Sequence, residues 1–428
     1  MGHPKVIELI DKLKDELGLH KNRPQENSLE CIDYYFELII GYYERVLKAK
    51  EEGKYLVGHT VICPIEIFYA LDIVPFHIEA FALFHNFFGD VQEYLNLAAE
   101  FGFPPEICSA HRVTDAMAIA RAFPKPDFFV FSSQACDNTP KSGEGMAELY
   151  DESPGYFLDR PCGYSERHIA YYTEELEGLV SFLEEQTGNK MDFDRLQEVV
   201  DLSYRLTELY AEINELRKAV PEPLPSEGLF AALAVFWLLA GTPEAVTFFE
   251  RLRDELAERV SKGIGAVPQE KFRILYTFVL PFFDMGLMDW MEKEHRASIV
   301  MWPLESWRGK GEWLVDRDKP LENIARKAFF HPGTYQHYGR IDDYVEDINR
   351  CAREYKANAA LFFAHIGCRH GCATQRIAKD EMAKLGIPMA TIDCDLVDKS
   401  FTTTEEVREK LDSFFEILAE KIKTKVSD

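Results

Sequence analysis

The sequence contains little cysteine and no long apolar run for its length of 428 residues. Nine cysteines are too few for a disulfide scaffold in a chain of this size, so we expect thiols or metal ligands in a reducing compartment. The longest apolar run, Leu229–Ala240, is well short of the roughly 20 residues that cross a bilayer. We therefore expect no membrane-spanning segment and assign this run to a buried helix.

Basic residues are scarce relative to acidic ones. Lys and Arg number 48 against 73 Asp and Glu, which gives a net charge of -25. Such a charge repels phosphate backbones and anionic lipids, so nucleic acid and membranes are not expected as partners. Segment 1–18 lacks the apolar core and cleavage site of a secretory signal, and we expect a cytoplasmic location. A Gly-x4-Gly-Lys-Ser/Thr loop is also missing, so ATP hydrolysis by this chain is not expected.

Alternating strand and helix patterns predict an α/β protein. The predicted strands are KYLVGHT, DFFVFSS and YFLD in residues 1–165, and FRILYTFVL, ASIVMWP, AALFFAH and PMATID in residues 266–428. Residues 166–265 between them show only helical periodicity, with helix ends marked by Gly188 and Thr242. We predict two Rossmann- or flavodoxin-like parallel-sheet domains, the first preceded by helices, with a helical segment between them.

Six cysteines fall at the ends of predicted strands or at the starts of predicted helices. They are Cys63, Cys108, Cys136, Cys162, Cys368 and Cys372. In open α/β sheets ligands gather at the carboxyl ends of strands, where helix starts offer free N–H groups that stabilise thiolates. Of the other cysteines, Cys31 and Cys351 lie inside helical patterns and are assigned to packing, whereas Cys394 closes a strand and is left undecided.

The segment HIGCRHGC, residues 365–372, carries two of these cysteines in a Cys-x3-Cys arrangement. Structural zinc favours Cys-x2-Cys pairs with a second pair at regular spacing, and no such set is present. A thioredoxin-like motif requires Cys-x-x-Cys, and a radical enzyme of the Cys-x3-Cys-x2-Cys type would need a cysteine where Gln375 stands. An iron–sulfur site and unligated loop thiols are the interpretations left open.

Seven segments occur in an order that identifies a family. They are CPIEIFYALDIVPF, PKPDFFVFSSQACDN, YFLDRP, YYTEELEGLVSFLEEQTG, FFAHIGCR, GIPMATIDCDLVD and EEVREKLDSFFEILAEKI. With them the chain resembles the 2-hydroxyacyl-CoA dehydratase and benzoyl-CoA reductase superfamily over nearly its whole length. The resemblance implies a 4Fe-4S cluster held by Cys63, Cys136 and Cys368 in the cleft between the two α/β domains. It also implies a separate ATP-hydrolysing iron–sulfur activator that supplies the electrons.

The chain departs from the one-cluster members in three further cysteines, Cys108, Cys162 and Cys372. In this it resembles the double-cubane cluster branch, in which an 8Fe-9S unit is held in a homodimer. That resemblance implies low-potential reduction of small molecules with an ATP-dependent reductase as partner. Two alternatives stay open: a subunit of an (R)-2-hydroxyacyl-CoA dehydratase or benzoyl-CoA reductase with a single 4Fe-4S cluster, and a non-catalytic electron or cluster carrier.

Reduction also requires protons, and titratable groups near the cysteine loops are the candidate catalytic proton donors. These candidates are Glu66, His365, His370 and His59. For each of them a purely structural role, as a helix cap, an ion-pair partner or a core side chain, is the alternative. In the dehydratase interpretation Arg308 and Lys310 would meet a CoA phosphate, although such a loop is more often a surface turn.

Overall fold

Two four-stranded parallel sheets organise the part of the chain that the computed structural model describes, residues 3–23, 28–89, 91–134, 136–150, 153–307 and 313–427. The first sheet contains β1 (Leu56–His59), β2 (Val74–His77), β3 (Phe128–Ser132) and β4 (Gly155–Leu158), in the order β2-β1-β3-β4. The second contains β5 (Phe272–Tyr276), β6 (Ala297–Met301), β7 (Ala359–His365) and β8 (Met389–Cys394), in the order β6-β5-β7-β8. The prediction of an α/β protein with two Rossmann- or flavodoxin-like parallel sheets is confirmed.

The strand order reverses at the same place in each sheet. The chain moves from the first strand to one side and then crosses to the other, which leaves a crevice at the carboxyl ends of the two central strands. In the first sheet these strands are β1 and β3, and His59 pairs with Val130. In the second they are β5 and β7, and β7 ends where His365 pairs with Cys394 of β8. The loops after β1, β3 and β7 therefore begin at these crevices.

Strand β2 was not among the predicted strands. It has four residues and includes Pro75, which pairs with Val57 of β1. Since β2 lies at the edge of its sheet, the missing N–H of Pro75 costs no ladder hydrogen bond on the outer side. A short strand that contains proline lacks the signal by which sequence patterns identify strands.

Helices account for most of the remaining chain. Around the first sheet these are α1 (Pro4–Lys21), α2 (Cys31–Lys48), α3 (Ile65–Ala70), α4 (Ile78–Phe88), α5 (Gln92–Glu100), α6 (Ser109–Ile119) and α7 (Thr139–Leu149). Along residues 286–427 lie α12 (Gly286–His295), the short 3-10 helix η1 (Pro303–Glu305), α13 (Pro320–Phe330), which packs on α8 and α9, α14 (Pro332–Tyr338), α15 (Ile341–Glu354), α16 (Arg369–Lys384) and α17 (Thr404–Ser427).

Four consecutive helices separate the two sheets, as the helical periodicity predicts. They are α8 (Glu166–Thr187), α9 (Phe193–Leu216), α10 (Ser226–Leu239) and α11 (Pro243–Lys262). Their ends have local causes: Asp192 accepts hydrogen bonds from N–H groups at the start of α9, Thr242 caps α11, and Gly188, with a φ of 74°, ends α8. The division into domains 1–165, 166–265 and 266–428 stays a prediction.

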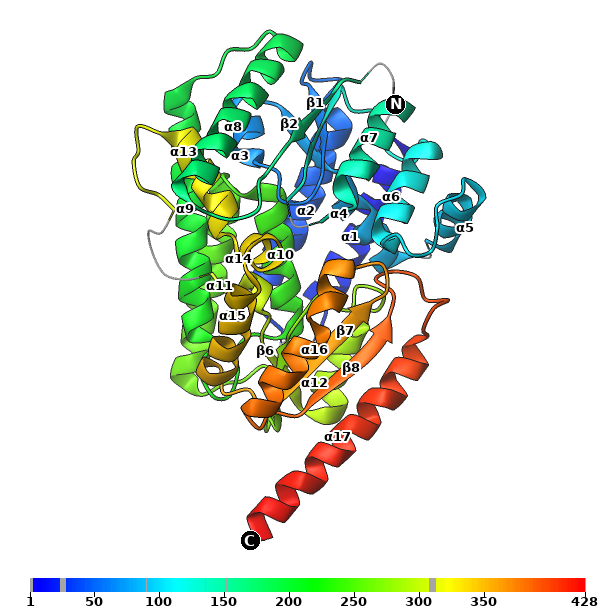
Figure 1. The fold of residues 1–428 in the computed structure, drawn as a ribbon, viewed down its shortest axis with the longest axis vertical. Coiled ribbons are helices and arrows are strands. Elements are labelled where there is room, and N and C mark those ends of the chain that lie inside the picture. The colour runs from blue at the N-terminus through cyan, green and yellow to red at the C-terminus, as the bar shows by residue number, and fades with distance from the viewer. Residues whose placement is uncertain are drawn as a thin grey trace.

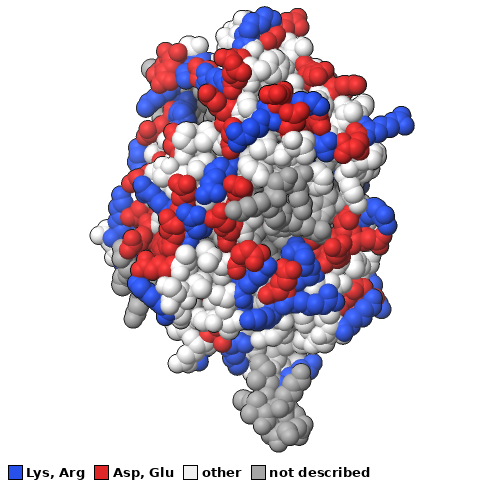
Figure 2. Space-filling view, turned by 90° about the vertical axis from the view of Figure 1, so that its left-hand side faces the viewer, with Lys and Arg blue, Asp and Glu red and all other residues white. Residues whose placement is uncertain are grey.

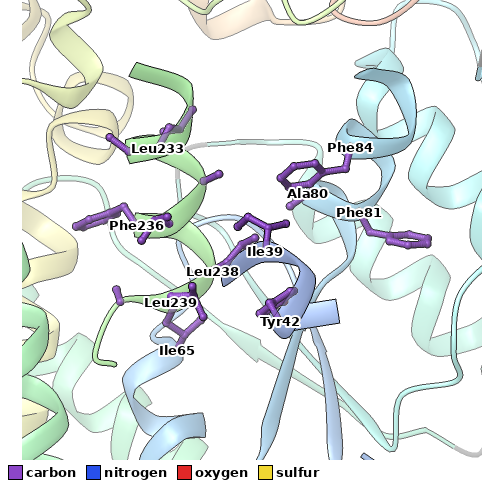
Figure 3. Close-up of a cluster of buried hydrophobic side chains, with 14 of the residues drawn as sticks. Ile39, Tyr42, Ile65, Ala80, Phe81, Phe84, Leu233, Phe236, Leu238 and Leu239 are labelled. Carbon is purple, nitrogen blue, oxygen red and sulfur yellow. The ribbon is translucent and has the colours of Figure 1, made fainter. Parts of the chain in front are cut away.

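Helix α10 packs against α2, and the prediction that its apolar run forms a buried helix is confirmed. Figure 3 shows Leu238 and Leu239 of α10 close to Ile39 of α2, Ile65 of α3 and Ala80 of α4. Full burial of an aliphatic side chain contributes about 1.5–3 kcal/mol. Because Ile65 begins α3, this packing also holds the loop that carries Cys63.

The two sheets lie one above the other in Figure 1, with α8, α9 and α11 along one side and α17 extending from the lower end. Acidic and basic side chains are intermingled over the face shown in Figure 2. Within the described ranges, no helix combines the length and apolar character needed to cross a membrane.

Candidate functional site

Cys63 lies in the loop from β1 to α3, at the crevice of the first sheet. Its thiol donates a hydrogen bond to the Val130 carbonyl of β3 at 3.5 Å and lies 3.7 Å from the Thr60 hydroxyl. Burial raises the pKa of Cys63 to about 12. A metal that binds this sulfur must therefore displace a proton that the surroundings otherwise retain.

Cys136 follows β3 and contacts a histidine that the sequence analysis did not single out. The Cys136 sulfur lies 3.3 Å from His111 Nε2, and His111 Nδ1 lies 3.4 Å from Glu79 Oε1. Burial favours the neutral thiol, but the charge and hydrogen bond of His111 outweigh it, and the pKa of Cys136 is lowered. Burial also opposes a charge on His111, yet Cys136 and Glu79 together raise the pKa of His111 to about 10. Cys136 is thus favoured as a thiolate.

Cys108 lies with Cys136 and Cys368, which come from loops of different sheets. Burial, followed by repulsion from these two cysteines, raises the pKa of Cys108 well above its usual value. The two loops touch, because a Cβ at Gly367 would lie 2.5 Å from Cys108 Cα. A glycine permits this close approach of two backbones. The structure therefore brings these three cysteines together.

Cys368 and Cys372 occupy the cap and the first turn of α16. Burial raises the pKa of Cys368 to about 12, and neighbouring Cys136 and Cys372 act in the same direction. The Cys372 thiol donates a hydrogen bond to the His365 carbonyl at 3.3 Å. On the other side of His365, Nδ1 lies 3.5 Å from the buried sulfur of Cys394. Cys394 thus lies beside the Cys368–Cys372 segment, and we assign it no role. Cys31 and Cys351 are buried in the core, where we expect packing cysteines to lie.

Cys162 is exposed, unlike the other five candidate ligands. Its loop nevertheless starts close to that of Cys136, because the Arg160 N–H donates to Ser133 Oγ at 2.9 Å. Across the residues that the structure describes, no three His, Cys, Asp or Glu side chains are grouped as the ligands of one metal ion. In their chemistry the residues fit an iron–sulfur cluster, because cysteine thiolates are its usual ligands and Cys136 is favoured in that form. The six-cysteine ligand set stays a prediction.

Polar contacts hold the two cysteine-bearing regions against each other. Asp137, next to Cys136, forms an ion pair with Arg369, next to Cys368. Ser109, at the start of α6, donates a hydrogen bond to Asp395, which follows β8. The Arg112 guanidinium adds an ion pair with Asp395 at 3.7 Å. These contacts join the first and second α/β parts close to the cysteines.

Glu66 is buried, with an exposed fraction of 2%. It lies on α3 and accepts hydrogen bonds from Ser203 Oγ at 2.6 Å and from Lys327 Nζ at 2.5 Å. An ammonium group beside a buried carboxylate satisfies its charge, which is the structural role considered above. The arrangement equally places the Lys327 amino group at the cavity that Cys63 lines. Sequence reasoning missed Lys327, because no pattern in α13 distinguishes it from a surface lysine.

The three histidine candidates differ in their surroundings. Burial lowers the pKa of His59 to about 4, and its Nδ1 lies 3.1 Å from the Thr60 carbonyl oxygen. Burial likewise lowers the pKa of His365. His370 is half-buried on α16, with its ring 6.4 Å from that of His337. A buried neutral histidine is a weak source of protons, and the roles of His365, His370 and Glu66 as proton donors stay predictions.

A small cavity of about 50 Å³ adjoins Cys63. Its lining includes Cys63, Glu66, Gln134, Lys327 and His331. A much larger cavity of about 1110 Å³ lies among α1, α2, α4, α10 and α12, and none of the six cysteines lines it. The small cavity is the better candidate for chemistry because it adjoins a predicted ligand.

Arg308 and Lys310, considered above for a CoA phosphate, lie outside the described residues.

Comparison with known proteins identifies related sequences. The family described as "2-hydroxyglutaryl-CoA dehydratase, D-component" matches residues 60–418. The chain is 24% identical to a subunit of the benzoyl-CoA reductase of Thauera aromatica, over 90% of this chain and 94% of that protein. It is 29% identical to the alpha subunit of the (R)-phenyllactyl-CoA dehydratase of Clostridium sporogenes, over 62% of this chain and 65% of that protein. It is 24% identical to the alpha subunit of the (R)-2-hydroxyisocaproyl-CoA dehydratase of Clostridioides difficile, over 90% of this chain and 96% of that protein.

Proposed function

Because the chain belongs to the 2-hydroxyglutaryl-CoA dehydratase D-component family, we propose that it is an iron–sulfur reductase of the double-cubane type. In this proposal Cys63, Cys108, Cys136, Cys162, Cys368 and Cys372 hold an 8Fe-9S cluster. The protein works as a cytoplasmic homodimer under anaerobic conditions, and an ATP-hydrolysing iron–sulfur reductase supplies its electrons. Its substrate is a small molecule that is reduced at low potential.

The position of Cys108 carries this proposal. The resemblance gives a one-cluster subunit three cysteine ligands, and Cys108 is not among them. Cys108 interacts with Cys136 and Cys368, and the backbone at Gly367 lies against it. Cys372 adds a second thiol beside Cys368. At least two cysteines beyond the family set thus lie in the same region, as six-cysteine ligation requires.

One neighbouring side chain, His111, favours the thiolate form of Cys136. When bound, an iron–sulfur cluster of this kind stores and transfers single electrons at low potential. His111 donates a hydrogen bond toward the Cys136 sulfur, and Glu79 lies at an ion-pair distance from the other ring nitrogen. Such outer contacts orient a ligand and adjust its charge. The ion pair of Asp137 with Arg369 keeps the loops of the two sheets in contact.

The second candidate is a subunit of an acyl-CoA dehydratase or reductase with a single 4Fe-4S cluster. The names of the relatives favour it, since they describe subunits for benzoyl-CoA, phenyllactyl-CoA and 2-hydroxyisocaproyl-CoA. The volume of the cavity at Cys63 argues against an acyl-CoA substrate in this conformation. It measures about 50 Å³, whereas a cavity that holds benzene measures about 150 Å³.

Iron and sulfide analysis of anaerobically purified protein tests the proposal. The double-cubane function predicts about eight irons per chain, and about four would contradict it in favour of the single-cluster subunit. Cys108→Ser should lower the iron content, whereas Cys351→Ser, at a buried cysteine in the core of the second sheet, should leave it unchanged. Turnover of a small substrate with the ATP-dependent reductase separates an enzyme from an electron or cluster carrier, which would show none.

A further inference from the structure

The small cavity beside Cys63 is lined by polar groups for which cysteine ligation alone gives no function. Three lining residues carry buried polar atoms without a hydrogen-bond partner within the described ranges: Gln134 Oε1, His59 Nε2 and Trp237 Nε1. Buried polar atoms in native proteins are nearly always paired, with protein, water or ligand. A cavity lined by such residues is therefore suited to a small polar guest. Ile65 and Phe236, both labelled in Figure 3, add apolar wall.

Lys327 lines one side of this cavity. Its ammonium group reaches Glu66 at 2.5 Å and Ser203 Oγ at 2.8 Å, and it lies 5.0 Å from the centre of the Phe236 ring. The Lys327 side chain keeps an exposed fraction of 12%, against 2% for Glu66. The Lys327 side chain is thus slightly open to solvent, whereas the Glu66 carboxylate lies inside.

The neighbouring histidine does not compete with Lys327 as a proton donor. His331 also lines the cavity, and burial together with the charge of Lys327 lowers the pKa of His331 to about 3. The ring is therefore neutral at the pH of a cell. Its Nδ1 is further engaged, because it accepts a hydrogen bond from the Gly333 N–H at 3.1 Å.

The volume of the cavity limits what can enter. A cavity of about 150 Å³ holds benzene, which has six non-hydrogen atoms. The cavity at Cys63, at about 50 Å³, is a third of that volume and has room for about two or three non-hydrogen atoms. A reducible molecule of this size takes up electrons at a multiple bond. The Lys327 ammonium favours a bond that ends in a hydrogen-bond acceptor.

We propose that this cavity binds the molecule to be reduced, a compound of about two or three non-hydrogen atoms with a multiple bond ending in a hydrogen-bond acceptor, and that Lys327 is its proton donor. The inference rests on the proposed function, because the electrons arrive through the site of which Cys63 is a ligand. It names the substrate class and a catalytic residue that the cysteine pattern does not contain.

Each reduction balances as a two-electron, two-proton step. Two electrons come from the ATP-dependent reductase, one π bond of the substrate breaks, and two new bonds to hydrogen form. An Nζ–H bond of Lys327 breaks, its proton goes to the substrate, and the electron pair stays on the nitrogen as a neutral amine. The amine regains a proton from solvent through its exposed part, and a second round supplies the second proton.

Lys327→Arg is the decisive variant. Arginine keeps a cation beside Glu66, but its guanidinium does not release a proton in proteins. We expect unchanged iron content and unchanged reduction of the protein by the ATP-dependent reductase without substrate, followed optically. Turnover of acetonitrile, which has three non-hydrogen atoms, should fall by at least about 100-fold. The control Arg326→Gln, at a side chain that pairs with Glu166 and Glu322, should retain turnover within about twofold.

Binding is measured apart from turnover. Acetonitrile should change the electron paramagnetic resonance spectrum of the reduced wild-type protein and of Lys327→Arg, and benzonitrile should change neither. If Lys327→Arg does not fold, the double variant Glu66→Gln with Lys327→Gln replaces it, because it removes both buried charges together.

Each outcome bears on one statement. Wild-type turnover in Lys327→Arg overturns Lys327 as the proton donor. A spectral change with benzonitrile as large as with acetonitrile overturns the small cavity as the binding site. About four irons per wild-type chain overturns the proposed function itself, and this inference with it.

Discussion

Cys136 and His111 lie 3.3 Å apart, sulfur to Nε2, and each favours the charged form of the other. His111 belongs to α6, and Cys108 caps the same helix. One short helix therefore supplies both a thiol and a hydrogen-bond donor to the region between the two sheets. Glu79 of α4, on the far side of the ring, lies 3.4 Å from His111 Nδ1 and adds to the rise in the pKa of His111.

Replacing His111 should make Cys136 less reactive. In His111→Phe the burial of Cys136 is no longer opposed by a positive charge, so the pKa of its thiol rises. Alkylation by iodoacetamide at pH 7, measured on the cluster-free protein by peptide mass spectrometry, should slow by at least about tenfold. Cys63, whose pKa burial raises to about 12, serves as an internal control and should react slowly in both proteins. Equal alkylation rates of Cys136 in wild type and His111→Phe would falsify the proposed effect of His111 on the Cys136 thiol.

A buried carboxyl group near the second sheet predicts a dependence of stability on pH. Burial raises the pKa of Glu305 to about 8, and its Oε2 has no partner within the described part of the chain. A carboxyl group with a raised folded pKa contributes its stability in full below its unfolded pKa of 4.5, and this contribution is lost as pH rises through about 8. Glu305→Gln removes the titration while keeping the shape. Denaturant unfolding should show that wild type loses roughly 1 kcal/mol per pH unit more than Glu305→Gln between pH 5 and pH 8. If the free energies of unfolding of wild type and Glu305→Gln changed equally with pH, Glu305 would not be the group that titrates.

That Cys63 and Cys136 follow strands was predictable, because it depends on local order along the chain. Cys63 and Cys136 come just after strands, and parallel strands bring their carboxyl ends to one edge whatever the loops contain. His111 is separated from Cys136 by 25 positions, and Lys327 from Glu66 by 261. Contacts over such separations are set by how helices pack across the molecule, which periodicity does not encode. His111 had one local signal, its place in the first turn of the helix that Cys108 begins.

Adding a methyl group at Gly367 should disturb the contact between the two cysteine loops. The new Cβ would lie 2.5 Å from Cys108 Cα, and a backbone atom cannot move aside as a side chain does. Gly367→Ala should therefore lower the iron content of anaerobically purified protein by at least about half and destabilise the chain by about 1–3 kcal/mol. Gly145→Ala is the matched control: Gly145 lies in α7, and its Cβ would have nothing within 4 Å. Full iron content in Gly367→Ala would show that Cys108 need not lie against this loop.

Cys162 distinguishes the one-cluster site from the two-cluster site. It is exposed, so iodoacetamide should modify it before the buried Cys31, Cys351 and Cys394 in cluster-free protein. Ligation by six cysteines requires the 160–163 loop to bring this sulfur onto iron, and anaerobically loaded protein should then be protected at Cys162 by at least about tenfold. Cys351, buried in the core, should stay unmodified in both states and controls for unfolding. If Cys162 is modified at the same rate with and without the cluster, it is not a ligand, and at most five of the six proposed cysteines bind iron. The double-cubane proposal would then need Cys394, which lies 3.5 Å from His365 Nδ1, as the sixth ligand.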